Sequence, residues 1–142
     1  MPDKIILDRL NAIAEHIATI EERMAGVSIA EDFRTKEGSV IFDAILIRLQ
    51  ALGENIKKIE SLQPGFVDQK LSIDVDNIIR FRDIISHHYE KLDTEIIYNI
   101  IQNQIPTLKN AVINHISGSN LLMKLTPRLI EKKSIKPRGR RL

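Results

Sequence analysis

Residues 4–25 read KIILDRLNAIAEHIATIEERMA, and this stretch decides the fold class. Its apolar side chains recur at alternating spacings of four and three residues, which places them on one face of a helix. We therefore expect a helix from about Lys4 to Ala25 that packs along its whole length, with Gly26 as its C-cap. The members of this apolar stripe are Ile6, Leu10, Ile13, Ile17, Ile20 and Met24.

The same spacing recurs farther along the chain and predicts a second helix from about Gly38 to Leu62. The polar residues 28–38 before it fit either a helix start or a loop. We expect the second helix to stop before Pro64, because the residue ahead of a proline is biased out of the helical conformation. Two apolar flanks indicate burial on more than one side; they are Phe42, Ile45, Leu49, Leu52, Ile56 and Ile59, and then Ile41, Ala44, Ile47 and Ala51.

Two further helices complete the expected fold. Ser72 or Asp74 can cap a third helix that ends near His87–Tyr89, and Asp93 can cap a fourth that ends at Gly118. Pro106 lies inside the fourth helix, where it removes a backbone donor and crowds an earlier carbonyl, so we expect a kink there and not a stop. Four helices with short connections predict an all-α antiparallel four-helix bundle with a kinked last helix.

Composition narrows the function classes. The chain has 142 residues, with 43% hydrophobic and 28% charged residues, which is typical of one globular domain. It has no cysteine, which excludes disulfides, thiolate metal sites and cysteine nucleophiles and fits a reducing cytoplasm. We find no signal peptide and no run of about 18 apolar residues. We therefore expect a cytoplasmic protein with no membrane contact, no metal and no cofactor.

Charge divides the chain into two parts. Residues 124–142 hold eight Lys or Arg and one acid, whereas residues 1–123 hold 13 Lys or Arg and 18 acids. We therefore predict a helical domain over 1–123 and a basic, flexible tail over 124–142. Such a tail can attract RNA or an acidic partner. It can equally be a solvated terminus that aids solubility, and the sequence leaves both interpretations open.

The stretch RFRDIISHHY, residues 80–89, concentrates side chains that can do chemistry. Arg82 shares a helical face with Ile78 and Ile85, so its guanidinium is semi-buried and needs either a carboxylate or a bound phosphate as partner. His87 lies five residues later, near the expected helix end, where an imidazole can transfer a proton near neutral pH. The structural alternative is that Arg82 pairs with Asp83 or a glutamate beside a histidine that only ends the helix.

The spacing Arg82-x4-His87-x-Tyr89 resembles the RxxxxHxY motif of the HEPN superfamily, in particular the HepT toxins. Other segments resemble the pattern of that family in the same order along the chain. RLQALGEN at 48–55 is similar to the second-helix IGEA segment, and IPTL at 105–108 is similar to a downstream LPxL segment. The resemblance covers roughly residues 4–117.

This resemblance implies a HEPN-type homodimer in which Arg82 and His87 of both subunits line one cleft. It implies a metal-independent endoribonuclease that leaves a 2′,3′-cyclic phosphate. Arg82 would bind the RNA phosphate, and His87 would shuttle a proton as the 2′-hydroxyl attacks. Asp83 would orient the site. His88 occupies a position that the motif leaves open, where it would aid catalysis or lie at the rim of the cleft.

The resemblance also implies a regulator. HepT toxins of type VII toxin–antitoxin pairs are encoded beside a minimal nucleotidyltransferase antitoxin (MntA-like) that transfers AMP to the motif tyrosine, here Tyr89. The added phosphate would silence the toxin by charge and bulk. Two alternatives stay open. One is a non-catalytic helical dimer that binds a nucleotidyltransferase or a nucleotide as scaffold or substrate, and the other is a purely structural bundle.

Overall fold

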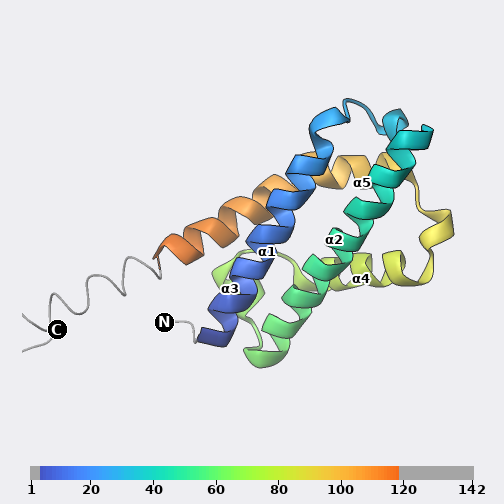
Figure 1. The fold of residues 1–142 in the computed structure, drawn as a ribbon. Coiled ribbons are helices and arrows are strands. Elements are labelled where there is room, and N and C mark those ends of the chain that lie inside the picture. The colour runs from blue at the N-terminus through green and yellow to red at the C-terminus, as the bar shows by residue number, and fades with distance from the viewer. Residues whose placement is uncertain (1–3, 119–142) are drawn as a thin grey trace, which may run out of the picture.

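The computed structural model describes residues 4–118, and that part of the chain is all-α, as the sequence predicts. The long helices α1 and α2 lie side by side and run antiparallel, and the later helices cover one side of this pair (Figure 1). The predicted tail over 124–142 lies outside the described residues. The helices are α1 (Lys4–Arg23), α2 (Lys36–Leu62), α3 (Phe66–Lys70), α4 (Val75–His87) and α5 (Thr94–Asn99), and the chain is again helical over 105–118.

The connection between α1 and α2 differs from the expected one at its start. Gly26 is not a left-handed C-cap, because the short 3₁₀ turn η1 (Met24–Gly26) follows α1 and the N–H of Val27 closes it on the carbonyl of Met24 at 2.9 Å. The polar stretch is a loop that contains a second 3₁₀ turn, η2 (Ala30–Arg34). α2 then begins where the Thr35 hydroxyl accepts the N–H of Gly38 at 2.9 Å.

The predicted apolar stripes form the core. All the stripe residues of α1 from Ile6 to Ile20 are buried, and Met24 packs against them. On α2 the main stripe is buried from Ile45 onward. The prediction for one flank residue is wrong: Ile47 is 67% exposed, because its side of α2 faces solvent beside the polar residues described below.

The last helix continues through Pro106, which confirms the prediction that this proline does not stop it. Asp93 caps α5 by accepting the N–H of Glu95 at 2.8 Å. The helix then widens into the π turn η4 (Ile100–Gln104) and resumes over 105–118. Proline has no N–H for the carbonyl of Gln102, so the wider turn lies where the regular ladder would be broken. Figure 1 shows the helix changing direction in this region.

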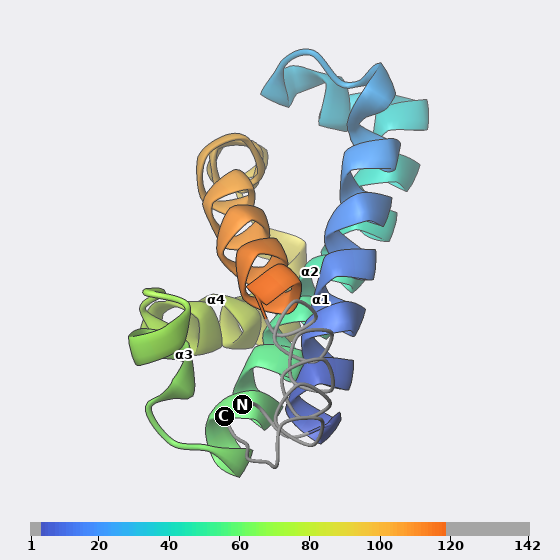
Figure 2. The ribbon, with the colours of Figure 1, turned by 90° about the vertical axis from the view of Figure 1, so that its left-hand side faces the viewer.

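α4 carries the motif. Asp74, and not Ser72, caps it by accepting the N–H groups of Asp76 at 3.1 Å and Asn77 at 3.3 Å. Figure 2 shows that α4 crosses the α1–α2 pair and does not run along it. α3, which follows the turn at Gly65, was not predicted, because five residues are too short for a periodic pattern.

Candidate functional site

One face of α2 meets the motif. Asp43, Ile47, Gln50 and Glu54 follow one another at spacings of four, three and four residues, so they lie on the same side of the helix. We call these four residues the motif face of α2. Asp43, Gln50 and Glu54 bond to residues 82–89, and Ile47 is exposed among them.

Arg82 is held by two carboxylates. Its Nη1 donates to Oδ1 of Asp83 at 2.6 Å, and its Nη2 forms an ion pair with Glu54. The Arg82 side chain is 21% exposed, which confirms the predicted semi-buried position. Gly53 makes this approach possible, since a Cβ at Gly53 would lie 2.8 Å from the Cβ of Arg82. The guanidinium is therefore fixed in orientation, with an Nε that has no partner within the described residues.

Two further bonds tie α4 and its end to α2. Nε2 of Gln50 donates to the hydroxyl of Ser86 at 2.9 Å, and that hydroxyl donates to the carbonyl of Arg82 at 3.1 Å. The hydroxyl of Tyr89 donates to the carboxylate of Asp43. This bond, helped by partial desolvation, raises the pKa of Tyr89. Tyr89 is 48% exposed, so its ring is anchored and accessible at the same time.

The two motif histidines lie at the end of α4. His87 is the last residue of the helix, and the N–H of His88 donates to the carbonyl of Ile84 at 2.9 Å. Both side chains are exposed, and neither has a hydrogen-bond partner among residues 4–118. The structure therefore brings Arg82 and Tyr89 against α2 through carboxylates and leaves the imidazoles of His87 and His88 open to solvent.

Asp43 and Gln50 were not predicted as site residues, because neither belongs to the motif. Both residues could have been found from Glu54, which lies in the segment that resembles the family. Counting back from Glu54 by four and then by seven residues gives Gln50 and Asp43 on the same side of a helix. What the pattern could not supply is which side of α2 faces the motif.

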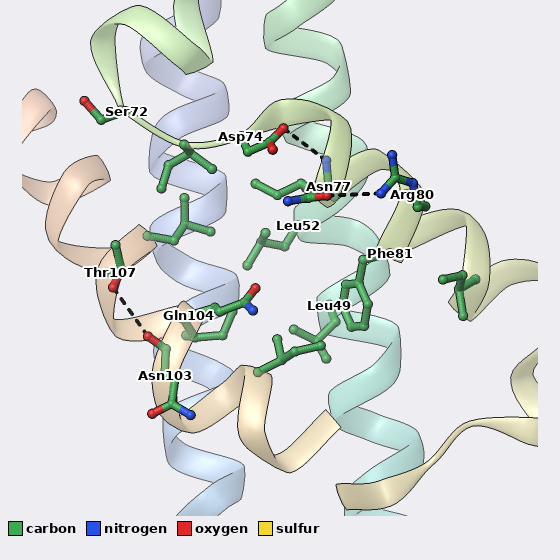
Figure 3. Close-up of a pocket in the computed structure, with 17 residues that line it drawn as sticks. Leu49, Leu52, Ser72, Asp74, Asn77, Arg80, Phe81, Asn103, Gln104 and Thr107 are labelled. Carbon is green, nitrogen blue, oxygen red and sulfur yellow. Dashed lines mark hydrogen bonds between the residues drawn. The ribbon is translucent and has the colours of Figure 1, made fainter. Parts of the chain in front are cut away.

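A separate pocket lies between α2, α4 and the π turn, with a volume of about 460 Å³ (Figure 3). Leu49, Leu52 and Phe81 contribute apolar surface, and Asn77 and Arg80 lie at its polar side, where Nη1 of Arg80 donates to Oδ1 of Asn77 at 3.2 Å. None of Arg82, His87 and Tyr89 lines this pocket. The α4 residues that line it, such as Asn77 and Arg80, are not residues of the Arg82–His87–Tyr89 motif.

Within residues 4–118 no three His, Asp or Glu side chains are close enough together to share a metal ion. None of the helices in that part of the chain combines the length and the apolarity needed to cross a membrane.

Comparison with known proteins places the chain in a family. Residues 13–114 match the family described as "Ribonuclease HepT-like", which is more than half of the chain. A protein of Methanocaldococcus jannaschii named "Putative RNase MJ0127" is 26% identical over 106 residues, which is 75% of this chain and 83% of that protein. No solved structure matches the chain. On the extent of the family match, this chain belongs to the HepT-like ribonuclease family.

Proposed function

We propose that this protein is a metal-independent endoribonuclease whose catalytic residues are Arg82 and His87. The observation that carries the proposal is the arrangement at the end of α4, in a chain of a ribonuclease family. A guanidinium fixed by Glu54 and Asp83 lies five residues before the last residue of the helix, His87, whose side chain is exposed. These are the two groups that a metal-free attack on an RNA phosphate requires.

The chemistry assigns one task to each side chain. The imidazole of His87 takes the proton of the RNA 2′-hydroxyl, whose oxygen attacks the adjacent phosphorus. The bond to the 5′-oxygen breaks, that oxygen receives the proton from the His87 imidazolium directly or through water, and a 2′,3′-cyclic phosphate remains. A guanidinium has five N–H donors, and the contacts of Arg82 with Asp83 and Glu54 leave donors for a phosphate oxygen. Asp83 and Glu54 thus orient Arg82 for the charge that develops on the phosphate.

We place this site at the interface of a homodimer. Ile47 and Val40 are each 67% exposed on the side of α2 that carries Asp43. Burying such side chains against a second copy removes apolar area from water and brings two motif faces together. Ile47→Glu should convert the dimer to a monomer in light scattering after gel filtration, whereas Ile29→Glu, at an exposed isoleucine elsewhere, should not. A monomeric wild type would contradict the composite site.

The cognate regulator in this proposal is a minimal nucleotidyltransferase antitoxin that transfers AMP to Tyr89, in a type VII toxin–antitoxin pair. The half-exposed phenol of Tyr89 supports this role, since its oxygen lies at the surface two residues beyond His87. An AMP group there would put a negative charge beside the RNA phosphate site. Incubation with the partner and ATP should add one AMP to the wild type and none to Tyr89→Phe, as measured by mass spectrometry.

Cleavage of a defined RNA oligonucleotide tests the catalytic assignment. Arg82→Ala and His87→Ala should each lower kcat/KM by about 100-fold or more while circular dichroism is unchanged. Arg80→Ala is the matched control, because Arg80 lies on the same helix but lines the separate pocket and not the motif site. EDTA should leave the rate unchanged, and a 2′-O-methyl group at the cleavage site should abolish the reaction. Loss of activity in EDTA, with recovery on adding divalent ions, would refute the His87 mechanism.

A second candidate is a non-catalytic dimer that serves the nucleotidyltransferase as scaffold or substrate. One observation favours it: two carboxylates already neutralise Arg82. The two candidates separate in cells. Expression of the ribonuclease should arrest growth, and Arg82→Ala should relieve the arrest, whereas a scaffold should cause no arrest and should still accept AMP on Tyr89.

A further inference from the structure

The backbone that carries His87 is held at two points. One residue before it, the Ser86 hydroxyl accepts a hydrogen bond from Gln50 at 2.9 Å. Two residues after it, the Tyr89 hydroxyl donates to Asp43. Both bonds end on the motif face of α2.

The bond on the far side of His87 matters more, because the helix has ended there. His88 leaves the helical conformation with φ −130° and ψ 31°, and η3 (Tyr89–Lys91) is a single 3₁₀ turn. The imidazole of His87 makes no hydrogen bond of its own within the described residues. The helix therefore holds the His87 backbone only from the N-terminal side, and the side chain that bonds the following turn to α2 is Tyr89.

We propose that Asp43 is a positioning residue for His87 and that a modification of Tyr89 acts on the site through Asp43. The inference rests on the proposed function, since it takes His87 as catalytic and Tyr89 as the modified residue. It goes beyond that function because it assigns a role to one carboxylate on α2. We call the hydrogen bond between Tyr89 and Asp43 the tie.

Modification necessarily breaks the tie. When the Tyr89 oxygen bonds to the α-phosphorus of a nucleoside triphosphate, pyrophosphate leaves with the electrons of the broken P–O bond, and the phenol proton passes to Asp43 or to water. The product has no hydroxyl hydrogen for Asp43 to accept. It instead places a phosphate anion against the Asp43 carboxylate, so an attraction is replaced by a repulsion between like charges. The turn that follows His87 is thereby released from α2.

A double-mutant cycle on RNA cleavage tests the positioning role. Asp43→Ala and Tyr89→Phe should each lower kcat by about tenfold through misplacement of His87, with KM for RNA unchanged because Arg82 still holds the phosphate. The double variant should be no worse than either single variant. Asp43→Asn should restore kcat, because its amide oxygen still accepts the phenol hydrogen. Glu37→Ala removes another exposed acid from α2 and should have no effect.

Several outcomes overturn the proposal. Effects of the two single variants that multiply in the double variant would show that Asp43 and Tyr89 act separately, and unchanged kcat in both would show that the tie does not position His87. If the wild type cleaves no RNA, the proposed function fails, and the tie is judged by the ring resonances of His87 in NMR spectra. Those resonances should shift equally in Asp43→Ala and Tyr89→Phe but not in Asp43→Asn, and an absence of shift would refute the tie.

The effect of modification is tested by placing phosphotyrosine at position 89 by genetic encoding. With Asp43 present, the phosphate should disorder the turn and abolish cleavage. In Asp43→Asn, which removes the repelling charge, at least several-fold more activity should remain. O-methyltyrosine, which removes the donor without adding charge, should lower kcat only as far as Tyr89→Phe does. Equal loss with phosphotyrosine in both backgrounds would mean that the phosphate acts by blocking RNA and not through Asp43.

Discussion

The two faces of α2 use the same helical spacing for different purposes. One face carries Leu49, Leu52, Ile56 and Ile59, which are at most 4% exposed. The other face carries the motif-face residues, of which Ile47 is 67% exposed and the polar members bond to residues 82–89. The difference shows that one helix both builds the core and positions the motif, with each task confined to one side.

The energetics of the two faces differ accordingly. Burying an aliphatic side chain contributes about 1.5–3 kcal/mol, and that contribution is the basis of the fold. Partly exposed polar and ionic pairs contribute about 0–1 kcal/mol each, because water competes for both partners. We therefore expect substitutions on the buried face to change stability and substitutions on the motif face to change activity.

The strongest test replaces the same residue type on the two faces. Ile56→Ala should lower the free energy of unfolding by about 2–5 kcal/mol, because Ile56 is fully buried and its removal leaves a cavity. Ile47→Ala should change it by no more than about 0.5 kcal/mol in the monomer. Urea unfolding of both variants, at one protein concentration low enough for the chain to be monomeric, measures the difference. Similar losses in both would mean that the two faces are not energetically distinct.

A smaller effect on stability is expected at Gly53, where α2 lies against Arg82 of α4. Gly53→Ala puts a methyl group against Arg82, and overpacking of this kind costs about 1–3 kcal/mol, offset by about 1 kcal/mol of helix propensity. Because Arg82 must move, RNA cleavage should fall markedly even though the free energy of unfolding changes little. Gly26→Ala is the control, since nothing lies within 4 Å of a Cβ there. Full activity in Gly53→Ala would show that α4 can shift without disturbing Arg82.

The bond between Asp43 and Tyr89 should also change the titration of Tyr89 at high pH. Asp43 raises the pKa of Tyr89, so the bond between them persists below about pH 10 and is lost as pH rises through the folded-state pKa. Asp43→Asn should bring this pKa back toward its ordinary value. Phenolate absorbance in a Tyr98→Phe background reports Tyr89 alone, since the chain has two tyrosines. An identical titration in Asp43→Asn would show that the bond does not form in solution.

The smallest expected effect is on the pKa of His16, which lies on α1 beside Arg48 of α2. Burial, and then the charge of Arg48, lowers the pKa of His16, whose Nδ1 lies 3.2 Å from Nη1 of Arg48. The folded protein thus binds this proton less readily than the unfolded chain does. The contribution of His16 to stability is full above about pH 6.5 and is lost as pH falls through the folded-state pKa. NMR titration should show a higher His16 pKa in Arg48→Gln, and an unchanged value would assign the whole shift to burial.

The fold was predictable because its signal is local. Apolar residues at spacings of three and four show where α1 and α2 lie, and Asp74 and Asp93 mark helix starts by their capping chemistry. The wrong prediction for Ile47 concerns a property that local sequence does not determine. Ile47 fits the periodic pattern of a buried flank, but burial depends on which neighbour covers that side, and no neighbour within residues 4–118 does.

The sequence by itself determined the long helices, the motif residues Arg82, His87 and Tyr89, and the requirement that a semi-buried Arg82 have a partner. Only the tertiary structure decided that the partners are Asp83 and Glu54, and that Tyr89 bonds to Asp43, 46 residues away along the chain. The physical reason is range. Helix periodicity and capping act over a few residues, whereas the crossing of α4 over α2, which is set by core packing and by the space that Gly53 leaves, chooses which distant side chains meet.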